Sequence, residues 1–165
     1  MSTDMRKHVL NLLETYHERE RKIALLRYEL EHPAHISPEE MLGAMSLRRG
    51  DGISSSGGRI SDKTLYIALN YQEKVEQANL DVAHEIAGQL VELEQQQKRL
   101  NYYITLLDER QVDVIRLIFF ERYAQNEVAK KLSIVSRTVR RTKEEAIDKL
   151  VEMYSFAENL TESHN

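Results

Sequence analysis

One 28-residue segment, residues 123–150, constrains the fold of this chain more than any other, because its apolar residues are spaced for two short crossing helices. Val128 and Leu132 lie four residues apart on one helical stripe, and Ala129 places a small side chain where a second helix would come closest. Ile134 would fill the turn between the helices. This spacing predicts a helix-turn-helix whose second helix, over residues 136–150, buries Val139, Ala146, Ile147 and Leu150.

The outer face of this predicted unit is basic. Residues 122–150 contain eight Lys and Arg against four Asp and Glu, a local balance of +4, whereas the whole chain carries −4 and the remainder therefore −8. A basic module on an acidic body attracts phosphate locally and discourages indiscriminate wrapping of nucleic acid. Double-stranded DNA is therefore the expected ligand, and the predicted contact residues are Ser136, Arg137, Thr138, Arg140, Arg141, Lys143, Lys130 and Lys131.

Two groups of residues carry a resemblance to a known family. Eight positions in the segment have matching character: Glu127, Val128, Leu132, Val139, Arg140, Ala146, Lys149 and Leu150. Upstream lies the run Leu107-Asp108-Glu109-Arg110-Gln111, followed by Val114, Ile115, Leu117 and Phe120. Together, over about residues 107–154, they resemble region four of housekeeping sigma factors. The resemblance implies a helix-turn-helix DNA-binding domain over residues 108–154.

The organisation of the whole chain adds a second resemblance. A long N-terminal helix, a Gly/Ser stretch, Ser61-Asp62-Lys63-Thr64 and a second long helix precede the sigma-like segment. No aromatic-rich segment able to melt a promoter is evident, and the chain has no Trp. This arrangement resembles phage and prophage transcriptional regulators of the ArpU/RinA type. The resemblance implies an activator of late phage genes that acts with the host RNA polymerase.

Two positions depart from the sigma pattern. Ser133 stands where Gly is usual in the turn, and a non-Gly residue in a left-handed conformation costs about 1 kcal/mol. Val135 stands where Ser or Thr usually caps the recognition helix, and valine has no side-chain acceptor for this role. We therefore expect Ser136 to act as the N-cap, with the helix starting one residue later. This leaves the register of the base-contacting positions open by about one residue.

The residues before the motif predict two long helices that pair with each other. Over residues 3–31, apolar residues alternate spacings of four and three, with one charged exception, Arg19. A second run over residues 62–107 has the same spacing and is interrupted by Gln97. The expected seams are Met5, Val9, Leu12, Tyr16, Ile23, Leu26 and Leu30 in the first helix, and Ala83, Ile86, Leu90, Leu93, Leu100, Ile104 and Leu107 in the second.

The expected fold is all-α, because β-branched alternation is scarce and the chain has only two prolines. Residues 1–107 would form a long antiparallel helical hairpin or coiled coil, and residues 155–165 a flexible tail. The second helix is the longer one, so its surplus could pair with another chain in a homodimer. The Gly/Ser-rich loop over residues 43–61 has two readings: a flexible connector, or an arm that contacts an anion or RNA polymerase.

Features of an enzyme are weak in this sequence. The chain has no Cys, and only His32 and His35, with Glu31 and Glu39 nearby, approach the spacing of metal ligands, which a solvated helix end explains more simply. No glycine-rich phosphate motif or nucleophile motif is evident. We therefore expect no catalysis, cofactor or metal. Without a visible signal peptide or a long apolar run, we expect a cytoplasmic protein that does not bind membranes.

Two alternative functions remain open at this stage. A DNA-packaging factor similar to a small terminase subunit also combines a helix-turn-helix with helical oligomerisation elements, and it would form a ring-sized assembly. A polymerase-binding adaptor that does not contact DNA would use the same module to bind protein, and it would lack salt-sensitive DNA binding.

Overall fold

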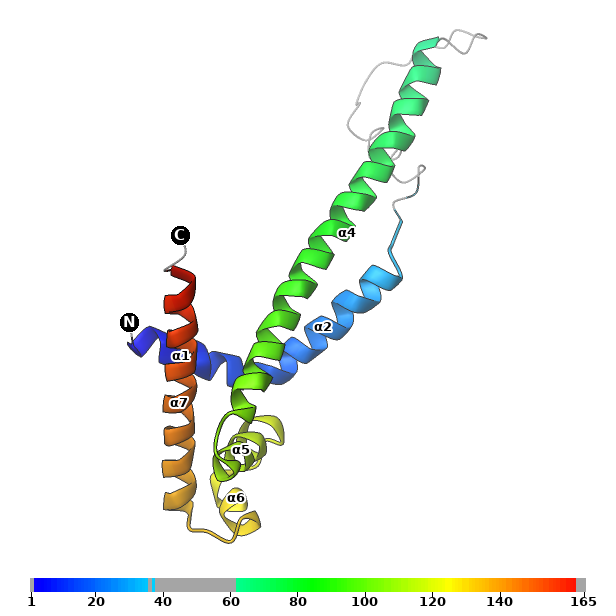
Figure 1. The fold of residues 1–165 in the computed structure, drawn as a ribbon. Helices are drawn as coiled ribbons and strands as arrows, with labels where there is room; N and C mark the ends of the chain where they lie inside the picture. Colours follow the sequence, from blue (N-terminus) through cyan, green and yellow to red (C-terminus); the bar gives the residue numbers. More distant parts are fainter. Residues whose placement is uncertain (1, 36, 38–61, 163–165) are drawn as a thin grey trace, which may run out of the picture. The chain divides into compact units, whose positions relative to one another are not determined.

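The computed structural model describes residues 2–35, 37 and 62–162, and these residues are almost entirely helical, without strands. The predicted all-α fold is therefore confirmed (Figure 1). The predicted loop over residues 43–61 lies outside the described residues. The elements are α1 (Ser2–Glu14), α2 (Tyr16–Glu31), α4 (Asp62–Thr105), α5 (Glu109–Ile115), the π-helix η1 (Arg116–Phe120), α6 (Gln125–Lys131) and α7 (Ser136–Glu162).

The chain divides into two compact units. Met1–Ala24 together with Glu92–Asn165 form the first unit, which holds α1, the start of α2, the end of α4, and α5 to α7. Leu25–Val91 form the second unit. The candidate site lies in the first unit. The predicted domain boundary after residue 107 implies that residues 108–154 fold independently, and this stays a prediction.

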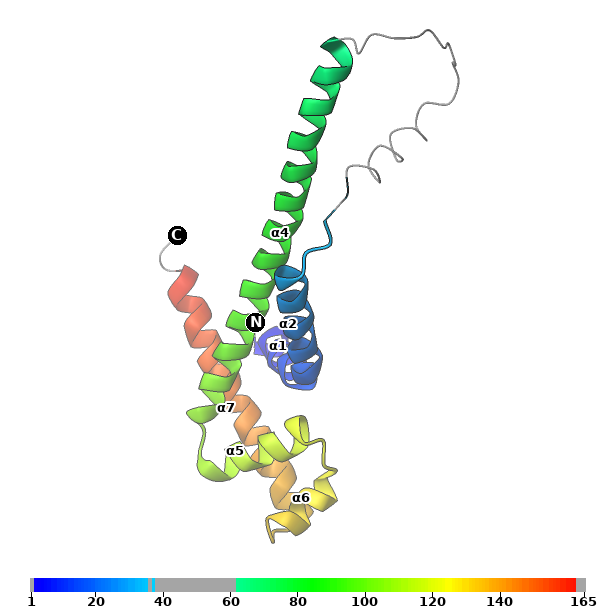
Figure 2. The same ribbon diagram turned by 90° about the vertical axis from the view of Figure 1, so that its right-hand side faces the viewer.

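The N-terminal helical stretch is broken at Thr15. The sequence predicts one helix over residues 3–31, and this prediction is wrong, because α1 and α2 are separate helices. Thr15 Oγ1 donates a 2.7 Å hydrogen bond to the backbone oxygen of Asn11, a side-chain bond that bends helices. Figures 1 and 2 show that α1 crosses α7, whereas the start of α2 lies beside the end of α4. The two parts of one predicted seam therefore pack against different partners.

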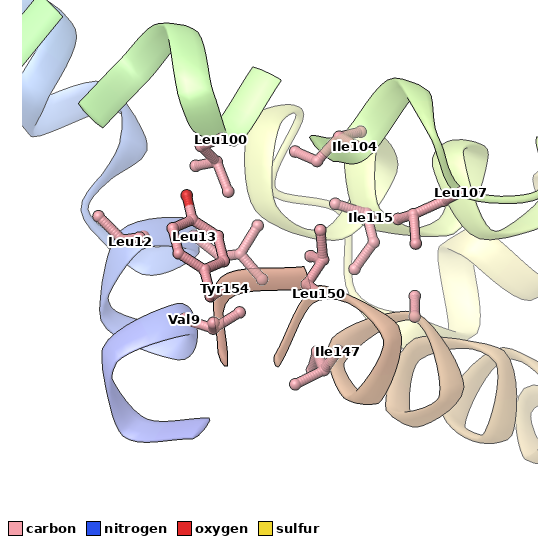
Figure 3. Close-up of a cluster of buried hydrophobic side chains, with 11 residues drawn as sticks. Val9, Leu12, Leu13, Leu100, Ile104, Leu107, Ile115, Ile147, Leu150 and Tyr154 are labelled. Atoms are coloured by element: carbon pink, nitrogen blue, oxygen red, sulfur yellow. The ribbon is translucent and has the colours of Figure 1, made fainter. Parts of the chain in front are cut away.

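The main core of the first unit lies where α1, the end of α4, α5 and α7 converge (Figure 3). Burial of each fully enclosed leucine or isoleucine contributes about 1.5 to 3 kcal/mol. Helix α1 supplies Val9, Leu12 and Leu13 to this core, so it shares the core with α7. The buried residues are Val9, Leu12, Leu13, Leu100, Ile104, Leu107, Ile115, Ala146, Ile147, Leu150 and Tyr154.

A second, smaller core holds the crossing of α6 and α7. Val128 and Ala129 of α6 are buried against Val139 of α7, and Val114 of α5 closes the cluster. Ile134, in the turn, packs against the same cluster. The predicted buried face of the helix-turn-helix is therefore confirmed.

The second unit shows less burial than a continuous coiled-coil seam would give. Leu26, Ile86 and Leu90 are half-buried, and Leu30 is exposed. A Cβ added at Gly88 would meet no atom within 4 Å, so this glycine does not serve close packing. The coiled coil stays a prediction for this unit.

The C-terminal end of α7 extends beyond the sequence expectation. Residues 155–162, predicted to belong to a flexible tail, are the last turns of this helix, and their flexibility stays a prediction. Tyr154 is buried in the main core, and Met153 packs against it. These contacts anchor the helix where the sequence shows only an acidic end. Residues 163–165 lie outside the described residues.

Candidate nucleic-acid interface

The turn that joins α6 to α7 is a Schellman motif with a serine in the left-handed position. The backbone N–H of Ile134 donates to the oxygen of Ala129 (3.0 Å), and that of Ser133 donates to the oxygen of Lys130 (3.3 Å). Ser133 has a φ of 53°. The expectation that this serine takes the left-handed place of a turn glycine is confirmed.

Helix α7 begins at Ser136, and Val135 occupies its N-cap position. The Val135 carbonyl accepts the first two hydrogen bonds of the helix, from the N–H groups of Thr138 (2.9 Å) and Val139 (3.2 Å). The predicted capping role of Ser136 is wrong, because its hydroxyl instead donates to Asn126 Oδ1 on α6 (2.8 Å). Ser136 therefore connects the start of α7 to α6.

Helix α6 is anchored near both ends. The Glu127 carboxylate accepts a 2.9 Å hydrogen bond from the N–H of Ala124, which is one half of a capping box. Near the other end, the Lys131 ammonium lies 4.3 Å from the centre of the Tyr123 ring, a cation–π contact. These contacts hold α6 against the chain that enters it.

The arginines at the start of α7 are open to solvent. Arg137 and Arg140 are exposed, as are Lys130 and Lys131 on α6. The Arg141 side chain is 81% exposed, and its Nε donates a 2.8 Å hydrogen bond to the carboxylate of Glu145, which raises the pKa of Arg141. The structure therefore leaves five of the predicted DNA-contacting side chains accessible on two adjacent helices.

The other three predicted contact residues are less accessible. Ser136 and Thr138 are half-buried, and the Lys143 side chain is only 21% exposed. The Lys143 ammonium lies 3.4 Å from the carboxylate of Glu144. Lys143 is thus less available to a phosphate than Lys130 or Lys131.

Two clefts flank the start of α7. The first, of about 570 Å³, is lined by Asn126, Ala129, Lys130, Ser133, Ile134, Val135 and Ser136. The second, of about 310 Å³, is lined by Asp108, Arg110, Gln111, Thr138, Arg141, Thr142 and Glu145. Arg110 is exposed and shares the second cleft with two predicted contact residues, Thr138 and Arg141. Arg110 is not among the predicted contact residues, although the run that contains it supports the sigma resemblance.

Contacts from outside the helix-turn-helix modify its charge. Arg6, on α1, forms ion pairs with both Glu144 and Asp148 of α7. The Lys149 ammonium lies 2.7 Å from the carboxylate of Asp108. Arg6 pairs with two of the four acids of the basic segment and adds one positive charge to it, an effect that the local sequence does not show.

The segment before α6 is held by the start of α2. His17 Nε2 lies 2.6 Å from the Phe120 backbone oxygen, so this ring nitrogen donates the hydrogen bond. Tyr16 stacks on the Phe120 ring at a centroid distance of 3.9 Å. Phe120 is the last residue of η1, so these contacts fix the chain that leads into α6.

The described part of the chain has neither a membrane-spanning helix nor a cluster of metal ligands. None of the described helices has the length and apolar character needed to cross a membrane. The described residues also contain no group of three His, Cys, Asp or Glu side chains placed to hold a metal ion. Glu39, the fourth member of the weak ligand set in the sequence, lies outside the described residues.

Comparison with known proteins assigns the C-terminal module. The family model described as Sigma-70, region 4 matches residues 104–152, from the end of α4 to the middle of α7. No curated protein and no solved structure matches the chain. The matched residues include the Schellman turn, the exposed arginines of α7 and both flanking clefts. The C-terminal module of this chain is therefore a helix-turn-helix of the sigma region-four type.

Proposed function

We propose that this protein is a sequence-specific DNA-binding transcriptional regulator of the phage ArpU/RinA type, which activates late genes together with the host RNA polymerase. The observation that carries this proposal is the exposed cationic face at the start of α7, where Arg137, Arg140 and Arg141 lie on a helix-turn-helix of the sigma region-four type. The organisation of the whole sequence supports the phage class.

In the proposed complex, the N-terminal end of α7 enters the major groove, as recognition helices do. Arg137, Arg140 and Arg141 read base edges, because a guanidinium can pair bidentately with guanine O6 and N7. The ion pair between Arg141 and Glu145 is exposed and therefore weak. It orients the guanidinium of Arg141 but does not prevent this group from contacting a base.

Contacts to the DNA backbone complete the interface. Three exposed cations can bind phosphates here. Lys130 lines the first cleft, Arg110 lines the second, and Lys131 follows Lys130 in α6. Such contacts position the protein and make its affinity depend on salt. Lys143 contributes less, because its side chain is 21% exposed and lies close to Glu144.

The second unit carries the dimer contacts in this proposal, and the protein acts in the cytoplasm with the polymerase. Leu25, Leu80 and Val82 support a protein contact here, because each is more than half exposed although apolar. Light scattering of the full chain is expected to show a dimer. A ring-sized assembly would favour the DNA-packaging alternative, and a monomer would contradict dimerisation.

The proposal is tested by selecting bound fragments from the source genome with purified full-length protein at near-physiological salt. A variant with Arg140→Ala and Arg141→Ala is selected in parallel. The matched control carries Lys74→Ala and Lys98→Ala, which also remove two positive charges, but from exposed positions on α4. We expect the unmodified protein and the control to enrich a discrete site near a promoter, and the double arginine variant to lose it.

Other outcomes have definite meanings. If no fragment is enriched by any of the proteins, sequence-specific DNA binding is wrong, and capture of RNA polymerase would then identify the adaptor alternative. If the double arginine variant enriches the same site as the unmodified protein, the assignment of base reading to these arginines is wrong.

A further inference from the structure

The turn before α7 presents an apolar side chain to solvent at the point where the proposed interface begins. Val135 is 67% exposed, which equals the highest exposure among the large hydrophobic side chains of the described residues. Its neighbour Ile134 packs into the core of the helix-turn-helix. An exposed valine beside a partly buried isoleucine that contacts the core shows that the apolar character of Val135 is not used for folding.

The backbone holds Val135 rigidly. Its carbonyl accepts hydrogen bonds from the N–H groups of Thr138 and Val139, and the N–H of Ile134 donates to Ala129. A β-branched side chain also has little freedom at χ1. The methyl groups of Val135 are therefore presented at one place, at low entropic cost for a contact.

The cleft that Val135 lines is mixed in character. It also contains Ala129, Ile134, Asn126, Lys130, Ser133 and Ser136. Ala129 is buried and Ile134 is partly buried, so Val135 is the exposed apolar side chain of this cleft. The Ser136 hydroxyl donates its hydrogen to Asn126 Oδ1, so it offers no donor to a base edge. A single exposed valine is too small for a protein partner, whose contacts are larger apolar patches. Its size suits one methyl group.

The major groove of DNA contains one kind of methyl group that a side chain can contact. The C5-methyl group of thymine is the only apolar group on the unmodified base edges there, and apolar side chains read it by contact. Cytosine presents the same group only when it is methylated at C5. An apolar side chain at the groove-entering end of a recognition helix is therefore chemically matched to this methyl.

We infer that Val135 reads the 5-methyl group of one thymine in the DNA site, and thereby determines specificity at a position that the arginines do not read. This inference rests on the proposed DNA binding and adds one base to its readout. Burying one methyl group against Val135 corresponds to about a fourfold gain in affinity.

The test uses the full chain and the DNA site enriched in the selection described above. Each thymine is replaced in turn by deoxyuracil, which lacks only the 5-methyl group, and dissociation constants are measured by fluorescence anisotropy. We expect one substitution to weaken binding about fourfold. The Val135→Ser variant should be insensitive to that substitution. Serine is a favoured N-cap residue, so the variant should fold.

Two controls separate this role from a general effect. Phe156→Ser changes another side chain that is 67% exposed, but it lies far along α7 from the turn, so the deoxyuracil pattern should stay unchanged. At the sensitive position, cytosine should bind weakly, and 5-methylcytosine should restore part of the affinity in the unmodified protein only.

Three outcomes would overturn the inference. If the unmodified protein binds every deoxyuracil site as tightly as the original, no thymine methyl is read, although DNA binding stands. If Val135→Ser keeps the same sensitivity, another side chain reads the methyl. If no specific site exists at all, the proposed function fails and this inference fails with it.

Discussion

Arg19 Nε donates a 2.6 Å hydrogen bond to Gln97 Oε1, so the two residues that interrupt the apolar stripes of the N-terminal helices are partners in the interior. Arg19 is 5% exposed and Gln97 is 8% exposed. The other Arg19 nitrogens donate to Thr15 Oγ1 (3.1 Å) and to the Leu12 carbonyl (2.7 Å). Burial lowers the pKa of Arg19. A buried polar pair of this kind fixes the register of two helices.

Gln97→Leu should lower the free energy of unfolding by about 1.5 to 3 kcal/mol, because it leaves a buried cationic donor without its acceptor. Arg19→Met combined with Gln97→Leu should recover part of this loss, since both polar groups are then removed. Urea unfolding of the four proteins in the double-mutant cycle measures the coupling. Strictly additive losses would show that the two residues do not depend on each other.

Ser133→Gly should raise the free energy of unfolding by about 0.5 to 1 kcal/mol, because glycine adopts the left-handed φ of 53° without a Cβ clash. Thermal unfolding followed by circular dichroism measures the change. Ser133→Ala is the matched control, and it should give no such gain because it keeps the Cβ. A glycine variant less stable than the alanine variant would contradict this explanation.

Tyr154 should make stability depend on pH in the alkaline range. Burial raises its pKa to about 12, so the folded state holds the phenol proton more tightly than the unfolded state, whose pKa is about 10. The contribution, at most about 3 kcal/mol, is present below pH 10 and is lost as the pH rises from 10 to 12. Urea unfolding at several pH values measures it against Tyr154→Phe, which should lack this loss. Parallel curves for the two proteins would contradict the expectation.

Helix α1 should be needed for the stability of the sigma-like module. Leu13→Ala should cost about 2 to 5 kcal/mol, because Leu13 is fully buried in the core that α7 shares. Leu106→Ala is the control, since this side chain is 53% exposed and its loss should change stability by less than about 0.5 kcal/mol. A fragment of residues 108–154 that unfolds at the same temperature as the module in the full chain would contradict this view and support the predicted domain boundary.

Lys130→Ala should weaken binding to all DNA sequences alike and reduce the slope of log affinity against log salt by about 0.9, the value for one lost phosphate contact. Lys143→Ala should reduce it less, because the Lys143 side chain is 21% exposed and lies 3.4 Å from Glu144. Titrations at several salt concentrations give both slopes. Equal changes for the two variants would show that Lys143 also reaches a phosphate.

The helix-turn-helix could be predicted from the sequence because its contacts are local. Val128, Ala129 and Val139 meet across one short turn, so their spacing along the chain already specifies which faces pack. The left-handed conformation of Ser133 is also a local feature, since helices commonly end with a residue in this conformation.

The long-range arrangement was decided by tertiary structure. Arg6 and Asp148 are 142 positions apart, and no local pattern relates them. The apolar spacing over residues 3–31 is compatible with one helix on one partner and with two helices on different partners. It therefore did not predict the break at Thr15 or the packing of α1 on α7. By itself, the sequence determined the helical fold class, the helix-turn-helix and the left-handed position of Ser133, because propensity and periodicity act within a few residues. Only the tertiary structure determined which faces meet and which cations stay exposed, because burial depends on partners distant in the chain.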